Sequence, residues 1–69
     1  MKRVAALLEV LFLEREFGYA SRSRLKNRLW IKYGLKPQYT RRLIRSLVED
    51  EILREYKPGR FRVEPGVKV

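Results

Sequence analysis

The side chains best suited to chemistry in this sequence are cations that gather in one stretch. The formal charge is +9, from 17 Lys plus Arg against 8 Asp plus Glu, and residues 1–20 and 49–69 each balance to zero. Solvated surfaces normally mix both signs, so the acid-free run 21–48 predicts a footprint for a polyanion. We expect nucleic acid, with an acidic protein or an anionic membrane as alternatives. The basic residues of the run are Arg22, Arg24, Lys26, Arg28, Lys32, Lys36, Arg41, Arg42 and Arg45.

Catalytic and metal-binding groups are scarce by comparison. The sequence has no Cys and no His, which removes disulfides, thiolate and imidazole catalysis and the usual zinc sites. Glu49, Asp50 and Glu51 are consecutive, and successive helical side chains diverge by about 100°, so they cannot all face one metal ion. We expect no enzyme activity, no cofactor and no metal site.

The N-terminal segment superficially mimics a signal peptide, because the apolar run from Val4 to Leu13 follows Lys2 and Arg3. However, Glu9 interrupts the run and no small-residue cleavage site follows it. Ten apolar positions are also too few to span a bilayer. We therefore expect neither export nor a membrane partner, and we expect a cytoplasmic, nucleoid-associated protein.

The periodicity of this segment predicts a first helix over about residues 2–17. Two apolar stripes leave only a narrow polar strip, which contains Lys2, Glu9 and Glu16. This apolar arc is wider than one buried face requires. Either the helix is central in the core, or it makes a homodimer contact through Phe12 and Leu13.

Two further helices follow, each with local signals at its ends. A break at residues 18–20 forms a turn or a short strand, and Ser21 or Ser23 then caps a helix that ends before Gly34, which suits the left-handed position after a helix. Pro37 suits the first turn of the next helix, where its missing N–H costs nothing. The residues expected to face inward are Leu25, Leu29, Trp30, Tyr33, Thr40, Leu43, Ile44 and Leu47.

Extended structure is predicted after these helices. Two short runs flank Pro58-Gly59, which suits the central positions of a type II turn. The pattern indicates a β-hairpin over about residues 52–63. Because a lone hairpin is barely stable in water, Phe61 and Val63 must pack on the helices.

These elements define the expected domain organisation. The fold class is mainly α with a small β-hairpin (α+β), in one domain that is stabilised by a single core. The expected ranges are one domain over 1–63, with helices at about 2–17, 22–33 and 37–50 and a hairpin at about 52–63, followed by a loose tail at 64–69.

Two helices joined tightly through Gly34, with outward arginines on the second, describe a helix-turn-helix. Over about residues 4–63 the chain resembles the winged helix-turn-helix domains of bacterial and archaeal transcriptional regulators. The most specific part is residues 40–53, which looks like the family's recognition helix running into its first wing strand. Leu47 and Ile52 take two core places of that pattern. One departure is Glu51, where the family often has Gly.

The resemblance implies sequence-specific binding of double-stranded DNA by a small transcriptional regulator, with the third helix in the major groove. RNA binding and a protein-interaction winged helix in a larger complex are the alternatives. Base reading and phosphate contact are both open to Arg41 and Arg42, whereas phosphate contact is favoured for Arg45. For the hairpin, the alternative is a charged edge strand that prevents aggregation. The candidates for base contact are Gln38, Tyr39, Arg41, Arg42 and Arg45; those for the DNA backbone are Arg22, Arg24, Lys26, Arg28 and Lys36; those of the wing are Lys57, Arg60 and Arg62.

The sequence carries less information about the kind of organism that the protein comes from and about a small-molecule effector. Asn27, Gln38 and Asp50 are the only residues of their types, and this arginine-rich composition is typical of thermophiles. By analogy we expect an archaeal, viral or plasmid regulator. No set of polar residues suggests a pocket, so we expect no small-molecule ligand.

Overall fold

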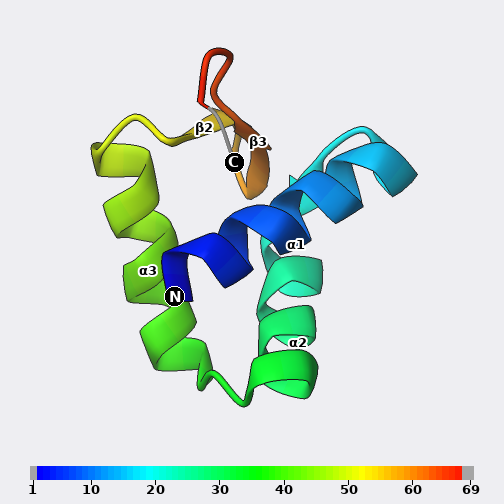
Figure 1. Cartoon of the computed structure of the whole chain (residues 1–69), viewed down its shortest axis with the longest axis vertical. Coiled ribbons are helices and arrows are strands. Elements are labelled where there is room, and N and C mark those ends of the chain that lie inside the picture. The colour runs from blue at the N-terminus through cyan, green and yellow to red at the C-terminus, as the bar shows by residue number, and fades with distance from the viewer. Residues whose placement is uncertain (1, 68–69) are drawn as a thin grey trace.

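Three helices and three short strands make up the computed structural model, which describes residues 2–67 (Figure 1). The predicted α+β class, mainly α with a small hairpin, is confirmed. Two helices have the predicted bounds, and the third ends one residue early. The elements are α1 (Lys2–Phe17), β1 (Ala20–Ser21), α2 (Arg22–Tyr33), α3 (Pro37–Glu49), β2 (Leu53–Lys57) and β3 (Arg60–Val63).

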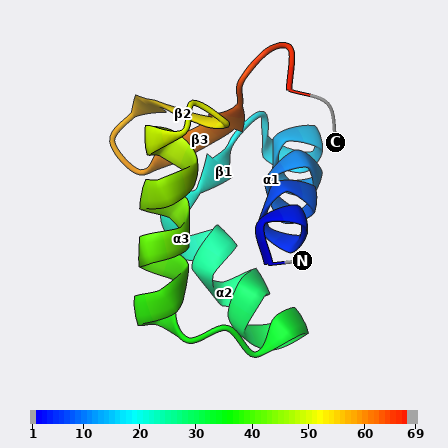
Figure 2. The same cartoon turned by 60° about the vertical axis from the view of Figure 1, so that its left-hand side comes forward.

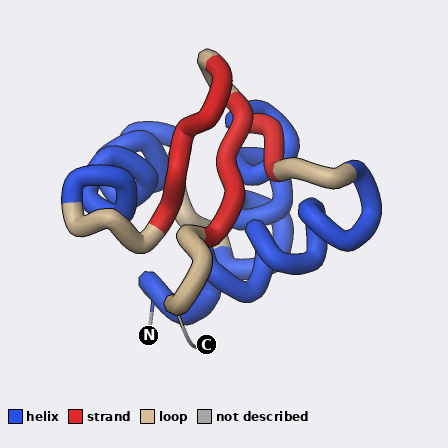
Figure 3. The backbone as a smooth tube through the Cα atoms, turned by 90° about the horizontal axis from the view of Figure 1, so that it is seen from above, coloured by secondary structure: helices blue, strands red, loops and turns tan. Residues whose placement is uncertain are grey.

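The sheet covers one end of the three helices (Figure 2). Its strands are antiparallel in the order β1-β3-β2, so β3 is central and Ala20 of β1 lies opposite Phe61 (Figure 3). The short strand between α1 and α2 thus enlarges the hairpin to a three-stranded sheet. Phe61 is fully buried where the sheet meets the helices, as the instability of a lone hairpin requires. The other buried apolar residues are Ala6, Leu7, Val10, Leu13, Ala20, Leu25, Leu29, Leu43, Ile44, Leu47 and Leu53.

Local signals in the sequence fix both ends of α2 and the start of α3. Ser21 is the N-cap of α2, and its hydroxyl accepts a hydrogen bond from the Arg24 amide at 3.2 Å. Gly34 ends α2 in the left-handed conformation, with φ of 68°. Pro37 occupies the first turn of α3. The rigid αα unit is therefore set largely by residues at its ends.

The turn after α3 contains Glu51, at the position where the resembled family often has Gly. Glu51 has φ of 59°, in the left-handed region that glycine favours. The turn is held by the Ile52 amide, which donates to the Leu47 carbonyl at 2.9 Å. The backbone therefore takes the glycine-type conformation although the residue is glutamate.

Glu9 was expected on the polar strip of the first helix, and this expectation is wrong. Its side chain is buried, with 3% of the residue exposed. Arg28 and Lys32 of α2 donate to its two oxygens, Lys32 at 3.1 Å, and the Tyr33 hydroxyl lies 3.4 Å from Oε2. Burial raises the pKa of Glu9, but the hydrogen bonds and positive charges of Arg28 and Lys32 outweigh it, so this pKa lies below its ordinary value. The carboxylate therefore joins α1 to α2 as an ion.

Three other expectations for side chains are also wrong. Trp30 is half exposed rather than in the core, and Tyr33 is exposed beside Glu9. Conversely, Leu13 is only 2% exposed, so it packs inside the molecule and cannot contact a second copy. The inner face of α3 is as predicted, since its four core-facing residues are all buried. These are Thr40, Leu43, Ile44 and Leu47.

The expected loose tail is anchored where it begins. The Glu64 amide donates to the Ile52 carbonyl at 2.9 Å, and the Glu64 carboxylate pairs with Arg54 at 2.9 Å. The last part of the predicted tail, residues 68–69, lies outside the described residues. In residues 2–67, no helix has the length and apolarity of a membrane span.

The conformation of Glu51 leads to a first prediction. Replacing Glu51→Gly should raise the free energy of unfolding by about 0.5–1 kcal/mol, because glycine adopts a positive φ without strain. The measurement is urea unfolding followed by circular dichroism. Glu49→Gly, within the last turn of α3, is the matched control and should lower stability by about 0.5–1 kcal/mol. A loss of stability in both variants would contradict the assigned strain.

The buried carboxylate leads to a second prediction. Glu9→Gln should lower the free energy of unfolding at neutral pH by about 1–3 kcal/mol, because Arg28 and Lys32 lose their anionic partner. A carboxylate with a lowered native pKa stabilises fully above its unfolded pKa of about 4.3, and this contribution disappears as pH falls through the native value. The gap between the parent protein and Glu9→Gln should therefore shrink on acidification. Glu16→Gln, on the exposed side of α1, is the control, and a gap independent of pH would contradict the ionised state of Glu9.

Candidate nucleic-acid interface

The outer face of α3 presents cations that have no ion-pair partner in the part of the chain that the structure describes. Arg41, Arg42 and Arg45 are exposed, and none of them pairs with a carboxylate of the described residues. Gln38, Arg42 and Arg45 follow an i, i+4, i+7 spacing, so they lie along the middle of this face. The opposite side of the helix is buried, which fixes the direction in which the guanidinium groups point.

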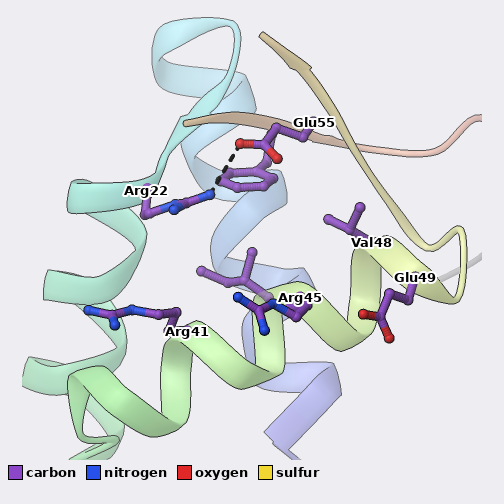
Figure 4. Close-up of a pocket in the computed structure, with 8 residues that line it drawn as sticks. Arg22, Arg41, Arg45, Val48, Glu49 and Glu55 are labelled. Carbon is purple, nitrogen blue, oxygen red and sulfur yellow. Dashed lines mark hydrogen bonds and ion pairs between the residues drawn. The ribbon is translucent and has the colours of Figure 1, made fainter. Parts of the chain in front are cut away.

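A hollow of about 270 Å³ lies between α3, the start of α2 and the hairpin (Figure 4). Arg41 and Arg45 line it from α3, and Arg22 lines it from α2. Two helices thus place three guanidinium groups around one concave surface that the hairpin closes. Its remaining lining residues are Ile44, Val48, Glu49, Glu55 and Phe61.

The tip of the hairpin is tied to the start of α2 by a small hydrogen-bonded clamp. The Glu55 carboxylate accepts from the Arg22 guanidinium at 3.1 Å and from the Gly59 amide at 2.9 Å. The Arg22 amide in turn donates to the Gly59 carbonyl at 2.9 Å. Arg22 was expected to be free for the DNA backbone, whereas its charge is paired inside the protein.

The other predicted backbone contacts of α2 do not share one surface. Arg28 is bonded to Glu9, and its guanidinium lies 4.1 Å from the centre of the Phe12 ring; that of Arg24 lies 3.8 Å from the Phe17 ring. Both arginines therefore lie against α1. The basic block 21–48 is divided between two faces of the molecule, because a helix distributes its side chains around its axis.

Lys26 and Lys36 belong to the side of the molecule where α3 begins. Lys26 lines a shallow hollow of about 360 Å³ together with Trp30 and Pro37. Lys36 directly precedes α3 and is exposed. These two lysines therefore lie near the first turn of α3.

Tyr39 lies on another side of α3 from Arg41 and Arg45, in a hollow that Arg42 also lines. Its ring lies under the Lys2 ammonium, 4.6 Å from the ring centre, and it lines a hollow that also includes Arg3 and Ser46. Arg3 donates to the Ser46 hydroxyl at 2.7 Å and pairs with Asp50 at 2.6 Å. Tyr39 is thus on the α1 side of α3, away from the hollow that Arg41 and Arg45 line.

The cations of the hairpin divide between structural and free roles. Arg62 donates from Nε to the Gly18 carbonyl at 2.9 Å and stacks on Tyr56, so it holds the sheet to the end of α1. Arg60 stacks on Tyr19, 4.6 Å from the ring centre, and is exposed. Lys57 is exposed without an ion pair among the described residues. The tip therefore retains two cations, Lys57 and Arg60.

Trp30 is the surface residue that sequence reasoning missed. Half of it is exposed, and it lies beside Lys26 and Pro37 in the shallow hollow. Leu25 and Leu29 mark the buried line of α2, and Trp30 follows Leu29 by one position, about 100° around the helix. That spacing is the signal that places the indole outside the core.

The consecutive acidic residues Glu49, Asp50 and Glu51 lie in different surroundings in the structure. Within residues 2–67, no three or more acidic side chains come together as a set that could hold a metal ion. Glu49 lines the hollow beside α3, Asp50 pairs with Arg3, and Glu51 occupies the left-handed turn. The three consecutive acids therefore have separate surroundings.

The clamp at the hairpin tip leads to a third prediction. Glu55→Ala should speed hydrogen exchange of the Gly59 amide and lower the free energy of unfolding by about 1 kcal/mol, because the amide and Arg22 lose a shared acceptor. Amide exchange measured by NMR tests both effects. Glu64→Ala removes a carboxylate from the opposite end of the hairpin and should leave the Gly59 amide unchanged. Equal acceleration in both variants would contradict a local clamp.

Known proteins provide no template for this interface. No protein-family model, no curated protein and no solved structure matches this chain. The candidate surface consists of the α3 guanidinium groups that have no ion-pair partner within residues 2–67, the lysines near the start of that helix and the two cations of the hairpin tip.

Proposed function

We propose that this chain is a winged helix-turn-helix protein that binds double-stranded DNA in a sequence-specific manner and acts as a small transcriptional regulator. The observation that carries the proposal is the outer face of α3, where three exposed arginines have no carboxylate partner among the described residues. Unpaired cations concentrated on one helix favour a polyanionic partner, because intramolecular pairing would otherwise stabilise the folded state.

The dimensions of α3 favour the major groove. An α-helix with its side chains is about 10–12 Å wide, and the major groove of B-DNA is about 12 Å wide. In this arrangement α3 is the recognition helix and the β2–β3 hairpin is the wing. The tight connection through Gly34 and the Arg22–Glu55–Gly59 clamp support the proposal, since they hold α2, α3 and the wing tip as one rigid surface.

Individual roles follow from position on the helix. Gln38, Arg42 and Arg45 lie along the middle of the outer face, so we assign them to base edges; guanidinium groups suit guanine and the amide suits adenine. Arg41 lies about 100° around the helix from Arg42, at the edge of the outer face, so we assign it to phosphate together with Lys36. Lys26 and the wing-tip cations extend the phosphate contacts on either side of α3.

The exposed aromatic residues favour a second candidate, RNA or single-stranded nucleic acid. Trp30 is half exposed beside Lys26, and Tyr39 is also exposed. Bases of single strands stack on such rings, and cations nearby bind the backbone. Because Trp30 is the sole tryptophan, its fluorescence distinguishes the candidates: tighter binding and stronger quenching with single-stranded RNA than with duplex DNA would favour this second candidate.

The proposed function leads to a fourth prediction. In-vitro selection from random duplexes should recover a preferred sequence, and with about 6–9 phosphates neutralised the log of affinity should fall with the log of salt at a slope of roughly −5 to −8. Arg42→Ala and Arg45→Ala should each weaken binding by about 1–3 kcal/mol and relax specificity at one position. Fluorescence anisotropy with the selected duplex measures both effects.

Arg15→Ala is the matched control, because Arg15 is an exposed arginine of α1 without an ion pair among the described residues. Its duplex affinity should stay within about twofold of the parent protein. A salt slope near zero would overturn DNA binding. Unchanged affinity in Arg42→Ala and Arg45→Ala would instead favour a protein-interaction domain, and an equal loss in Arg15→Ala would show that only bulk charge matters.

A further inference from the structure

The side of α1 that faces away from the core is apolar as well. Val4, Leu8, Leu11 and Phe12 are each between 36% and 51% exposed. Their spacing of i, i+4, i+7 and i+8 places them along one side of the helix, which we call the α1 stripe. An apolar helix surface is normally covered by another element, yet residues 2–67 leave the stripe largely open.

The two ends of the α1 stripe have complementary shapes. At its N-terminal end, Val4 and Leu8 line an apolar hollow of about 340 Å³, together with Tyr33 and Leu35. At its C-terminal end, Phe12 is 42% exposed, although the Arg28 guanidinium lies over its ring. Eight residues separate Val4 from Phe12, which corresponds to about 12 Å along a helix. One helix thus carries both a bulky aromatic side chain and a hollow that an aromatic ring can enter.

We propose that the α1 stripe is a homodimer interface in which the α1 helices of two copies pack antiparallel around a two-fold axis near Leu8. In this arrangement Phe12 of each copy enters the Val4–Leu8 hollow of the other, and the two Leu8 side chains meet at the axis. The same patch then serves both copies, as an isologous contact requires.

The charges that flank the α1 stripe select the antiparallel orientation. Lys2 borders the apolar hollow at the N-terminal end of the stripe, and Glu16 lies beside Phe12 at its C-terminal end. Antiparallel packing brings Lys2 of one copy to Glu16 of the other, whereas parallel packing brings like charges together. Arg15 ends the stripe, and its long side chain reaches solvent past the edge of the contact. Charge and shape therefore point to the same partner, a second copy of this chain.

The interface revises the dimer contact expected from the sequence. Phe12 keeps its expected role, while Leu13 is replaced by Val4, Leu8 and Leu11 because Leu13 is in the core. The α1 stripe contains none of the residues assigned to DNA. Dimerisation is therefore independent of the proposed function, and either can fail without the other.

Sedimentation equilibrium over a range of protein concentrations tests the proposal. The parent protein should dimerise, and Leu8→Glu should weaken the dimer by at least about tenfold, because a carboxylate at the two-fold axis faces its own copy. Ile31→Glu is the matched control, since Ile31 is 69% exposed on α2 outside the stripe, and it should dimerise normally. Circular dichroism establishes that all three proteins are folded. A parent protein that is monomeric throughout, or a dimer that Leu8→Glu does not weaken, would overturn the proposal.

The orientation is tested by single cysteines, because the sequence contains none. Under mild oxidation Leu8→Cys should form a disulfide-linked dimer, since position 8 meets itself at the axis. Val4→Cys should not, because the two copies of position 4 are separated by about 12 Å, beyond the span of a disulfide. Non-reducing electrophoresis measures the linked fraction. Equal linkage at both positions would indicate parallel helices, and absence of linkage at position 8 would exclude the proposed axis; either result overturns the arrangement.

Discussion

A buried carboxylate between two basic side chains is the interaction on which the arrangement of this small protein depends. Glu9 enters the interface of α1 with α2 and is held there by Arg28 and Lys32. An unpaired charge at this depth would be strongly unfavourable, so α2 must pack with these two cations toward α1. That choice also determines which side of α2 remains available to neighbouring elements and to solvent.

The pairing of Glu9 also affects which cations of the basic block keep their charge available at the surface. Two cations of the basic block, Arg28 and Lys32, share the single negative charge of Glu9, and Arg22 is paired with Glu55 at the tip of the hairpin. Stacking on the Phe17 ring holds Arg24 against α1. The arginines of α3 have no such partners among the described residues. The surface with the most freely available charge is thus smaller than the basic block of the sequence, and it is formed by α3 with the elements beside it.

Local features of the chain were predictable where short-range physics decides the outcome. Gly34 and Pro37 set the ends of adjacent helices, and the inner face of α3 followed from its 3.6-residue period. The candidate site was only partly predictable. Arg41 and Arg45 lie together as expected, but Arg22 is paired within the protein and Arg28 is turned to another face, because long-range partners compete for these guanidinium groups.

Residue types and local spacing were enough to predict the class of fold, the net charge of +9, the order of the helices and their bounds to within one residue. These properties depend on residue type and on spacing within a few turns of the chain. Long-range packing, in contrast, buries Glu9 as an ion, leaves Trp30 outside the core and divides the basic block between two faces. Those outcomes depend on which distant side chains arrive opposite each other, and helical periodicity carries no information about the partner across an interface.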